Sequence, residues 1–475
     1  MLRRHRAPSS HDNGASSGAH IDRWFSLLCD TDRKIYAGEL LRSSWSTCMT
    51  TGHTKAEDAT DSPLTDAELD ARFAPVFELI AAGSIEREQK RELAHEPVQW
   101  LKDAGFTSLR VPRPYGGGGV TLPQFFRLLT RLGEADSNLP RILRLNFGFI
   151  ESRLESDNEA LRERWLTKIA AGELIGAAIS ERTGATHNSV TLQRTGEGWR
   201  LNGEKYYSTG SLYADWIDVA AHDGTDDVRV VVRGDARGVT RLDDWDGSGQ
   251  RLTASGTTRF DQVEVTDEQF VMRYKGPEPK RNTSLTSFYQ SVHLATLAGI
   301  ARAVLRDGVA FVQGRTRTFG VPGRSSPRDN PLTQRVIGRL ASLAYGAENV
   351  VESVARSLRR IHQDHLAGRA KTEAYFALDI EAWQAQQVVI GQVLEAATLV
   401  FEAGGASATS KALRLDRHWR NARVIASHNP AIQREAAVGS FYLNGTPPDE
   451  RFSLPHTSVE IAGQDAGAPL GRQAA

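Results

Sequence analysis

The segment Trp199-Arg-Leu-Asn-Gly-Glu-Lys-Tyr-Tyr207 decides the fold, because it has the pattern of a β-strand in the middle of a chain that is otherwise helical in character. Its aromatic and alternating residues are typical of strands, and Asn202-Gly203 and Asp223-Gly224 indicate turns. The same character continues in three further stretches: Trp216–Ala221, Asp227–Val232 and Thr257–Val265. About a hundred residues of short strands predict a small barrel or sandwich.

Helical periodicity flanks this region on both sides. Leu64–Gly83 and Pro123–Leu132 carry apolar residues at spacings of three and four. The link Val111-Pro-Arg-Pro-Tyr-Gly-Gly-Gly-Gly119 between them cannot be helical, and its glycines lack the residues of a phosphate loop, so we expect a plain loop. Three long periods after the β region suit a helix bundle: Ser291–Gly314, Leu332–Ala367 and Lys371–Ala403.

The predicted organisation is therefore α+β with several domains. We expect a helical domain over 63–171, a β domain over 172–279 and a helical bundle over 280–446, followed by a tail over 447–475. Residues 1–62 are rich in Ser, Gly, Thr and Asp and are predicted to be a disordered extension, within which Met49 is a plausible alternative start.

Composition excludes several classes of function. Lys plus Arg and Asp plus Glu number 58 each, so nothing indicates nucleic acid or an anionic membrane as partner. No apolar run reaches the roughly 18 residues of a membrane span. The two cysteines, Cys29 and Cys48, have no ligand spacing, and His362-Gln-Asp-His365 lacks a third ligand, so we expect no metal site and a reducing, cytoplasmic location.

Three segments resemble the acyl-CoA dehydrogenase family. They are Phe106-Thr-Ser-Leu-Arg-Val-Pro-Arg-Pro-Tyr-Gly-Gly117, Ala178-Ile-Ser-Glu181 and Leu201-Asn-Gly-Glu-Lys-Tyr-Tyr-Ser-Thr-Gly210. The resemblance covers about residues 64 to 446. It implies an N-terminal helical domain, a central β-barrel domain and a C-terminal four-helix bundle. It also implies a homotetramer, because flavin sites in this fold are completed by neighbouring subunits.

Further segments resemble the branch of two-component flavin-dependent monooxygenases typified by dibenzothiophene monooxygenase. They are Asp244–Gly247, Thr253–Thr257, Phe401–Thr409, Leu415–Arg423 and Ser427–Pro430. This resemblance implies reduced FMN, with FAD as the alternative, supplied by a separate NAD(P)H-dependent flavin reductase. The implied reaction inserts one oxygen of O2, through a flavin C4a-hydroperoxide, into a small organic sulfur- or nitrogen-containing substrate.

The dipeptide His428-Asn429 favours oxygenation over dehydrogenation. Dehydrogenation of an acyl thioester needs a carboxylate base, and the resemblance places Asn429 where many members have that Glu. An amide cannot be a base at neutral pH, although Glu402 and Glu435 remain as alternatives. His428 matches a histidine near the flavin C4a position, and an imidazole can manage a proton near pH 7. The alternative is a helix-end histidine that only packs before Pro430.

Cofactor contacts are implied by the same resemblance. Ser208 and Thr209 are hydroxyl donors able to steady an oxygen adduct, and they are candidate catalytic residues with His428. Ser180 and Tyr207 are expected to contact the flavin, with Tyr207 preferred to Tyr206 because neighbouring strand residues face opposite sides.

The flavin phosphate has its own candidates. Arg317 is expected to reach the phosphate of a neighbouring subunit's flavin. The turn with Gly405, Ser407 and Thr409 offers N–H and hydroxyl groups, as an anion cradle needs. It departs from the resembling monooxygenases, which carry a basic residue near Ser407.

The predicted substrate pocket departs from the sulfur-oxygenating relatives. Arg141 and Leu145 stand where those have histidine and tyrosine, so the substrate is not inherited from them. The remaining candidates for lining the pocket are Trp245, Gln290, His293 and Asn429. The two other functions left open are an FAD-dependent acyl-CoA dehydrogenase and a non-catalytic flavoprotein scaffold.

Overall fold

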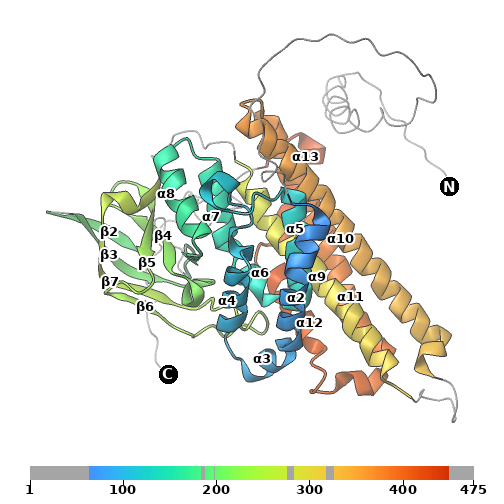
Figure 1. Ribbon diagram of the computed structural model, residues 1–475. Helices are drawn as coiled ribbons and strands as arrows, with labels where there is room; N and C mark the ends of the chain where they lie inside the picture. The colour runs from blue at the N-terminus through green and yellow to red at the C-terminus, as the bar shows by residue number, and fades with distance from the viewer. Residues whose placement is uncertain (1–63, 183–187, 197, 275–282, 317–325, 449–475) are drawn as a thin grey trace, which may run out of the picture. The chain divides into compact units, whose positions relative to one another are not determined.

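The computed structural model of the protein describes residues 64–182, 188–196, 198–274, 283–316 and 326–448 (Figure 1). The predicted extension over 1–62 lies outside the described residues. The described residues up to Glu435 belong to one compact unit, and residues 436–448 belong to another. Among the described helices, none combines the length and apolar character needed to span a membrane.

The N-terminal part is helical, as predicted. Its helices are α2 (Asp66–Ala82), α3 (Ser84–Lys90), α4 (His95–Asp103), α5 (Leu122–Ala135), α6 (Asn138–Ile142), α7 (Arg144–Leu154) and α8 (Glu159–Ala170). Thr65 and Thr121 begin α2 and α5 as capping boxes, with Glu68 and Gln124 as the reciprocal partners. Between α4 and α5 the chain forms short 3-10 turns, η1 (Phe106–Ser108) and η2 (Arg113–Tyr115), and the glycine run is the plain loop that was predicted.

Eight strands form one sheet in the centre of the chain. They are β1 (Ile175–Ala178), β2 (Thr191–Thr195), β3 (Gly198–Lys205), β4 (Trp216–His222), β5 (Asp227–Arg233), β6 (Val239–Arg241), β7 (Thr258–Val265) and β8 (Phe270–Tyr274). The order is β6-β7-β3-β2-β4-β5-β8, and β1 pairs with β4 in parallel. This hydrogen-bonded path runs from β6 to β8 in the described residues, so the predicted β domain is confirmed as a sheet, and its description as a barrel or sandwich stays a prediction.

One predicted turn lies inside a strand. Asp223-Gly224 turns the chain between β4 and β5, where the Asp223 N–H donates to the carbonyl of Asp226 (3.0 Å). Asn202-Gly203, in contrast, sits within β3, where the register to β7 shifts between Leu201 and Gly203. Gly203 has φ of 127° there, and a Cβ would lie 2.9 Å from the Cα of Val190. The pair is therefore a β-bulge.

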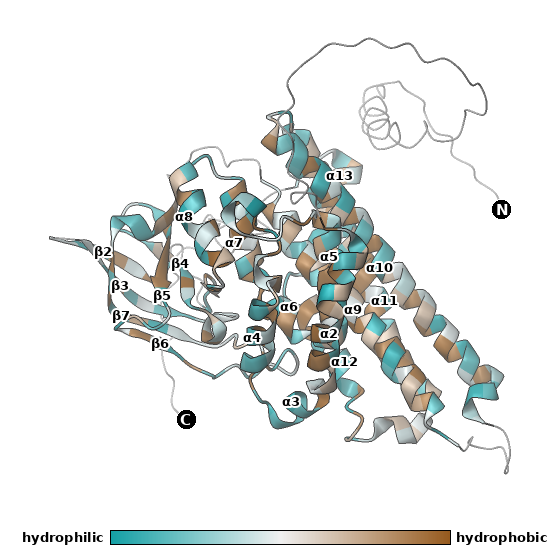
Figure 2. Ribbon diagram, in the orientation of Figure 1, coloured by the Kyte–Doolittle hydropathy of each residue, from teal (hydrophilic) through white to brown (hydrophobic). Residues whose placement is uncertain are grey.

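The C-terminal part is a bundle of long helices. It contains α9 (Leu285–Gln313), α10 (Pro331–Leu366) and α11 (Thr372–Leu399). The shorter helices α12 (Asp416–Ala426) and α13 (Ala431–Asn444) follow in the sequence, and α13 crosses the boundary between the two units after Glu435. Figure 1 shows α9, α10 and α11 side by side, and Figure 2 shows hydrophilic and hydrophobic residues alternating along α10. The remaining 3-10 turns are η3 (Ser211–Tyr213), η4 (Asp267–Gln269), η5 (Pro327–Asp329), η6 (Val400–Ala403) and η7 (Gly405–Thr409).

Helix α9 joins the N-terminal helices to the bundle through a close crossing with α5. A Cβ on Gly299 would lie 2.5 Å from the carbonyl oxygen of Thr130 and 2.6 Å from the carbonyl carbon of Gly133. Gly133 in turn faces the backbone of Thr296. Glycine is needed at this crossing because the two backbones leave no room for a side chain.

We expect Gly299→Ala to lower the free energy of unfolding by about 1–3 kcal/mol, because the added methyl group forces the helices apart. Gly338→Ala is the matched control, since Gly338 is exposed on α10 and an added methyl group would meet no described atom within 4 Å. It should be neutral or stabilising by up to about 1 kcal/mol. Denaturant unfolding measures both, and equal midpoints for the two variants would contradict the crossing.

Candidate functional site

The loop after β3 carries the residues predicted to contact the flavin ring. Tyr207 has φ of 60° and is 45% exposed, an unusual combination for a bulky residue. The loop is held in place by the N–H groups of Ser208 and Gly210, which donate to the carbonyls of Gly256 and Thr253 (both 3.0 Å). A strained and exposed aromatic residue on a braced loop makes this loop a candidate for ligand contact.

An aromatic group surrounds Tyr207. Its ring centroid is 4.8 Å from that of Tyr206 and 6.2 Å from that of Trp245. The indole N–H of Trp245 donates to the carbonyl of Gln250 (3.0 Å), and the Arg182 guanidinium covers the Tyr206 ring at 3.3 Å. The alternation argument for Tyr207 does not apply, because β3 ends before both tyrosines, yet Tyr207 is the exposed one.

The predicted hydroxyl groups differ in accessibility. The Thr209 hydroxyl is half-buried and shares a hydrogen bond with the Ser255 hydroxyl (2.8 Å), which also bonds Thr253 (2.8 Å). Ser208 is 0% exposed, and its hydroxyl donates weakly to the carbonyl of Lys205 (3.5 Å). Ser180 is exposed beyond the end of β1. Of the predicted pair on this loop, Thr209 is therefore the one placed to meet a ligand.

Helix α6 brings the same loop beside a predicted pocket residue. A Cβ on Gly210 would lie 2.5 Å from the carbonyl oxygen of Ile142, and Gly210 has φ of 78°. Only glycine accommodates both the close approach and this backbone conformation. The loop therefore abuts the end of α6, where Arg141 precedes Ile142.

Arg141 also belongs to a cluster of arginine and histidine side chains, which we call the basic cluster. We define it as Arg141, Arg144, His293, His428 and Arg434. The ring centroids of His293 and His428 are 4.5 Å apart, and Nη2 of Arg144 lies 3.5 Å from Nε2 of His428. The Arg144 guanidinium also covers the ring of Tyr289 at 4.9 Å.

Side-chain amides support this cluster. The Nδ2 group of Asn429 donates to Oε1 of Gln290 (2.8 Å), which also accepts from Nη1 of Arg434. Arg434 donates further to Oε1 of Gln386 (2.9 Å), whose Nε2 group donates to the Asn429 carbonyl (3.1 Å). Nδ1 of His428 lies 3.1 Å from Oδ1 of Asn429. Asn429 and Gln290, both predicted to line a pocket, are thus held rigidly.

The electrostatics of the cluster keep both histidines neutral. Burial, and then the charges of His428 and Arg144, hold the pKa of His293 well below its ordinary value. Loss of water around the ring, and then the charges of Arg141 and Arg144, likewise hold the pKa of His428 well below 6.5. His428 is exposed, and the guanidinium groups of Arg141 and Arg144 lower its pKa through their positive charge.

The predicted phosphate residues lie elsewhere in the chain. Gly405, Ser407 and Thr409 form η7, where the Thr409 hydroxyl donates to the carbonyl of Ala406 (2.7 Å). A Cβ on the preceding Gly404 would touch the ring of Phe311, which is 18 residues, or roughly 27 Å, along α9 from His293. Within one chain, the predicted phosphate residues of η7 therefore lie far from the basic cluster. Arg317 lies outside the described residues.

One predicted pocket residue lies in the core, and two residues of the basic cluster were missed by the sequence analysis. Leu145 is buried in the hydrophobic core. Arg144 and Arg434 were not predicted, although Arg144 follows Arg141 by three residues, across the junction between α6 and α7. Arg434 carried no such signal, because its partner Gln290 is distant in the sequence.

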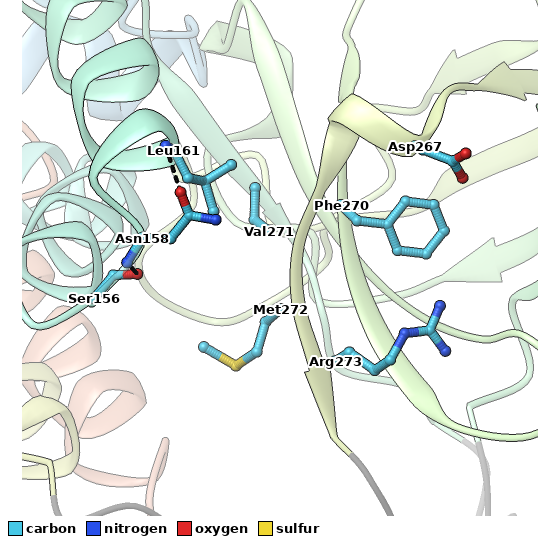
Figure 3. A pocket seen from close by; sticks show the side chains of 8 residues that line it. All are labelled: Ser156, Asn158, Leu161, Asp267, Phe270, Val271, Met272 and Arg273. Carbon is cyan, nitrogen blue, oxygen red and sulfur yellow. Dashed lines mark hydrogen bonds between the residues drawn. The ribbon is translucent and has the colours of Figure 1, made fainter.

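A separate hollow of about 350 Å³ lies between the start of α8 and β8 (Figure 3). It is lined by Ser156, Asn158, Leu161, Asp267, Phe270, Val271, Met272 and Arg273. None of the predicted site residues reaches it, and it holds no buried reactive group. It is therefore not the candidate site. Among the described residues no group of three or more His, Cys, Asp or Glu side chains could hold a metal ion.

Comparison with known proteins gives relatives over most of the chain. The chain is 24% identical to a probable FMNH2-dependent monooxygenase, SfnC, of Pseudomonas putida, over 78% of this chain and 94% of the relative. It is 25% identical to a dibenzothiophene monooxygenase of Rhodococcus qingshengii, over 78% of this chain and 92% of the relative.

Solved structures and family models also match most of the described part of the chain. The crystal structure of FMN-bound TdsC from Paenibacillus sp. A11-2 superposes with a TM-score of 0.74 at 23% identity, covering 80% of this chain and 98% of TdsC. Residues 76–173 match the acyl-CoA dehydrogenase N-terminal domain, and residues 291–432 match the acyl-CoA dehydrogenase C-terminal domain. The chain belongs to the acyl-CoA dehydrogenase family.

Proposed function

We propose that this protein is a flavin-dependent monooxygenase that uses reduced FMN. In the proposed reaction, a small sulfur- or nitrogen-containing substrate reacts with O2 and FMNH2. The products are the substrate carrying one added oxygen atom, FMN and water. The observation that carries the proposal is the pair His428-Asn429: His428 is a histidine held among cations, and its neighbour Asn429 stands where a dehydrogenase would need a carboxylate. The names of the similar proteins, an FMNH2-dependent monooxygenase and dibenzothiophene monooxygenases, support it.

The residues present fit the ring of a flavin. Tyr207 and Trp245 offer aromatic surfaces, and the half-buried hydroxyl of Thr209 offers a hydrogen bond at the loop that abuts α6. Bound reduced flavin would supply two electrons and activate O2. The Tyr207 loop would hold the ring beside Arg141, so that the reacting edge faces the basic cluster.

The hydrogen-bond network defines which nitrogen of His428 carries the proton. Arg434 can only donate, so the atom of Gln290 that faces it is the oxygen, and the group of Asn429 that donates to this oxygen is Nδ2. The oxygen of Asn429 then faces Nδ1 of His428, which must carry the hydrogen. Arg144 also can only donate, which assigns Nε2 as the acceptor.

His428 therefore presents a lone pair at Nε2 toward Arg144 and the cluster. A neutral imidazole in this tautomer accepts a proton or a hydrogen bond at Nε2, and Asn429 keeps the ring oriented through Nδ1. The sequence alone indicated only that the imidazole of His428 can manage a proton near pH 7. The network supports acceptance as the resting role.

The alternative of an acyl-CoA dehydrogenase has no base in this network. Asn429 occupies the expected position and is bonded to Gln290. Glu402 is exposed in η6, at the far end of α9, and Glu435 is exposed on α13. Within the described residues, neither carboxylate contacts the basic cluster.

Flavin content separates the two functions. We expect purified protein to be nearly colourless, to bind FMNH2 and to form a transient flavin-oxygen absorbance on mixing with O2. Stoichiometric yellow FAD that is bleached by an acyl-CoA without added reductant would establish the dehydrogenase instead. Binding of neither flavin would favour the scaffold. A generic NADH-dependent flavin reductase supplies FMNH2 for the assay.

The homotetramer and the reductase partner are part of the proposal. Because η7 lies roughly 27 Å along α9 from His293, a second copy is needed to place the phosphate candidates Gly405, Ser407 and Thr409 at the same flavin. Sedimentation of the active protein should give a multimer. A fully active monomer would contradict this arrangement.

We expect nitrogen NMR of labelled histidine to show His428 as the neutral Nδ1–H tautomer at pH 7. Because its pKa is depressed, the ring should remain neutral as the pH falls to 6, where an ordinary histidine is mostly charged. Asn429→Asp should raise the pKa, since a carboxylate beside Nδ1 favours the charged ring. A charged His428 in the wild type at pH 7 would refute the assigned network.

His428→Gln should uncouple the reaction. Without the imidazole, flavin binding and oxygen consumption are retained, while product formation falls about 10²- to 10⁴-fold and hydrogen peroxide is released. His365→Gln is the control, because the His365 ring lies on α10, where its Nδ1 shares a hydrogen bond with the Tyr375 hydroxyl (2.6 Å) and not with the basic cluster. The measurement is the ratio of product to peroxide per reduced flavin. An unchanged ratio in His428→Gln removes this residue from the mechanism.

A further inference from the structure

Arg141 is a buried cation without a partner for most of its guanidinium. It is 7% exposed, and neither Nε nor Nη1 has a hydrogen-bond partner among the described residues. Burial, and then the charge of Arg144, lowers the pKa of Arg141 to about 9. Buried charges in folded proteins are normally paired, because an isolated one is costly.

Several other buried or half-buried arginines of the same chain pair with a carboxylate: Arg110 with Glu151 (2.6 Å), Arg229 with Asp218 and Arg417 with Asp307 (both 2.5 Å). Buried Arg153 and Arg434 instead donate from Nη1, to the carbonyl of Val271 (3.2 Å) and to Oε1 of Gln386 (2.9 Å). Arg141 differs from both groups, because no described residue accepts a hydrogen bond from its Nε or its Nη1.

His293, in the same cluster as Arg141, is also buried without hydrogen-bond partners for its ring among the described residues. It is 2% exposed, and both of its ring nitrogens lack partners among the described residues. A neutral imidazole there holds one unused donor and one unused acceptor. Buried polar groups are seldom left unpaired unless a ligand or water completes them. The unused groups of Arg141 and His293 thus lie in one cluster, which reaches the surface at His428.

The charge around these groups has one sign. Arg141, Arg144 and Arg434 all act on the pKa values of His293 and His428 in the same direction. The acidic group that acts on the cluster is Asp379, which lies toward Arg434 and accepts a hydrogen bond from Ser287. The Arg141 end of the cluster is thus left with uncompensated positive charge.

We propose that the substrate of this enzyme is a small organic anion, and that Arg141 binds its oxyanion group, with His293 completing the site. A guanidinium fork suits a carboxylate or sulfinate, both of which offer two oxygens. This inference rests on the proposed function, since it places the oxidisable sulfur or nitrogen of the anion near His428.

The first test measures thermal unfolding of flavin-free protein. Ethanesulfinate should raise the Tm of the wild type, whereas the neutral ethyl methyl sulfone at equal concentration, with ionic strength matched by sodium chloride, should not. Arg141→Gln should abolish the shift and weaken sulfinate binding roughly 10- to 100-fold. Arg423→Gln, which removes an exposed charge bonded to Ser427, is the control and should keep the shift.

The same variant has a second expected property. Without any anion present, Arg141→Gln should be at least as stable as the wild type, because it removes an unpaired buried charge. A large loss of stability, together with no sulfinate shift in the wild type, would show that Arg141 is structural and would overturn the proposal.

Two further readouts separate the possible failures. If Arg141→Gln loses affinity for FMN but not for riboflavin, Arg141 binds the flavin phosphate and the substrate assignment is wrong. If the wild type shows the sulfinate shift but neither binds nor reoxidises FMNH2, the anion site stands and the proposed monooxygenase function fails. If FMNH2 is oxidised but sulfinate produces no shift and no product, the anion site fails alone.

Discussion

The burial of helix α9 is the constraint on which the rest of the structure depends. This helix contacts α5 on one side and α10 and α11 on the others, and the glycine crossing at Gly299 brings it against the N-terminal helices with no intervening side chain. Its first turns nevertheless carry Gln290 and His293. Because polar groups cannot be buried without partners, the neighbouring segments must supply them or a ligand must.

Part of this requirement is met within the protein. Gln290 is satisfied by Asn429 and Arg434, and the same bonds orient His428. His293 and Arg141 are not satisfied in this way by the described residues. The contrast distinguishes the groups that hold the site together from those free to bind a ligand. A single network thus links the packing of α9 to the chemistry proposed at His428.

The sequence predicted much of the fold because its signals are local. Apolar spacing identified the long helices, and aromatic and β-branched residues identified β3, β4, β5 and β7. It missed shorter strands such as β6 (Val239–Arg241), and it took Asn202-Gly203 for a turn, since a bulge depends on the neighbouring strand β7 and not on the dipeptide. The order in which the strands pair could not be predicted for the same reason, because pairing joins segments that are distant in the sequence.

By itself, the sequence determined the order of helices and strands, the family and the candidate residues His428, Asn429, Arg141 and His293. Periodicity and short motifs are properties of neighbouring residues and are readable in one dimension. Only the tertiary structure decided which of these residues meet, that Arg141 and His293 are left without partners among the described residues, and which nitrogen of His428 accepts. Those outcomes depend on burial and on hydrogen bonds between segments more than a hundred residues apart.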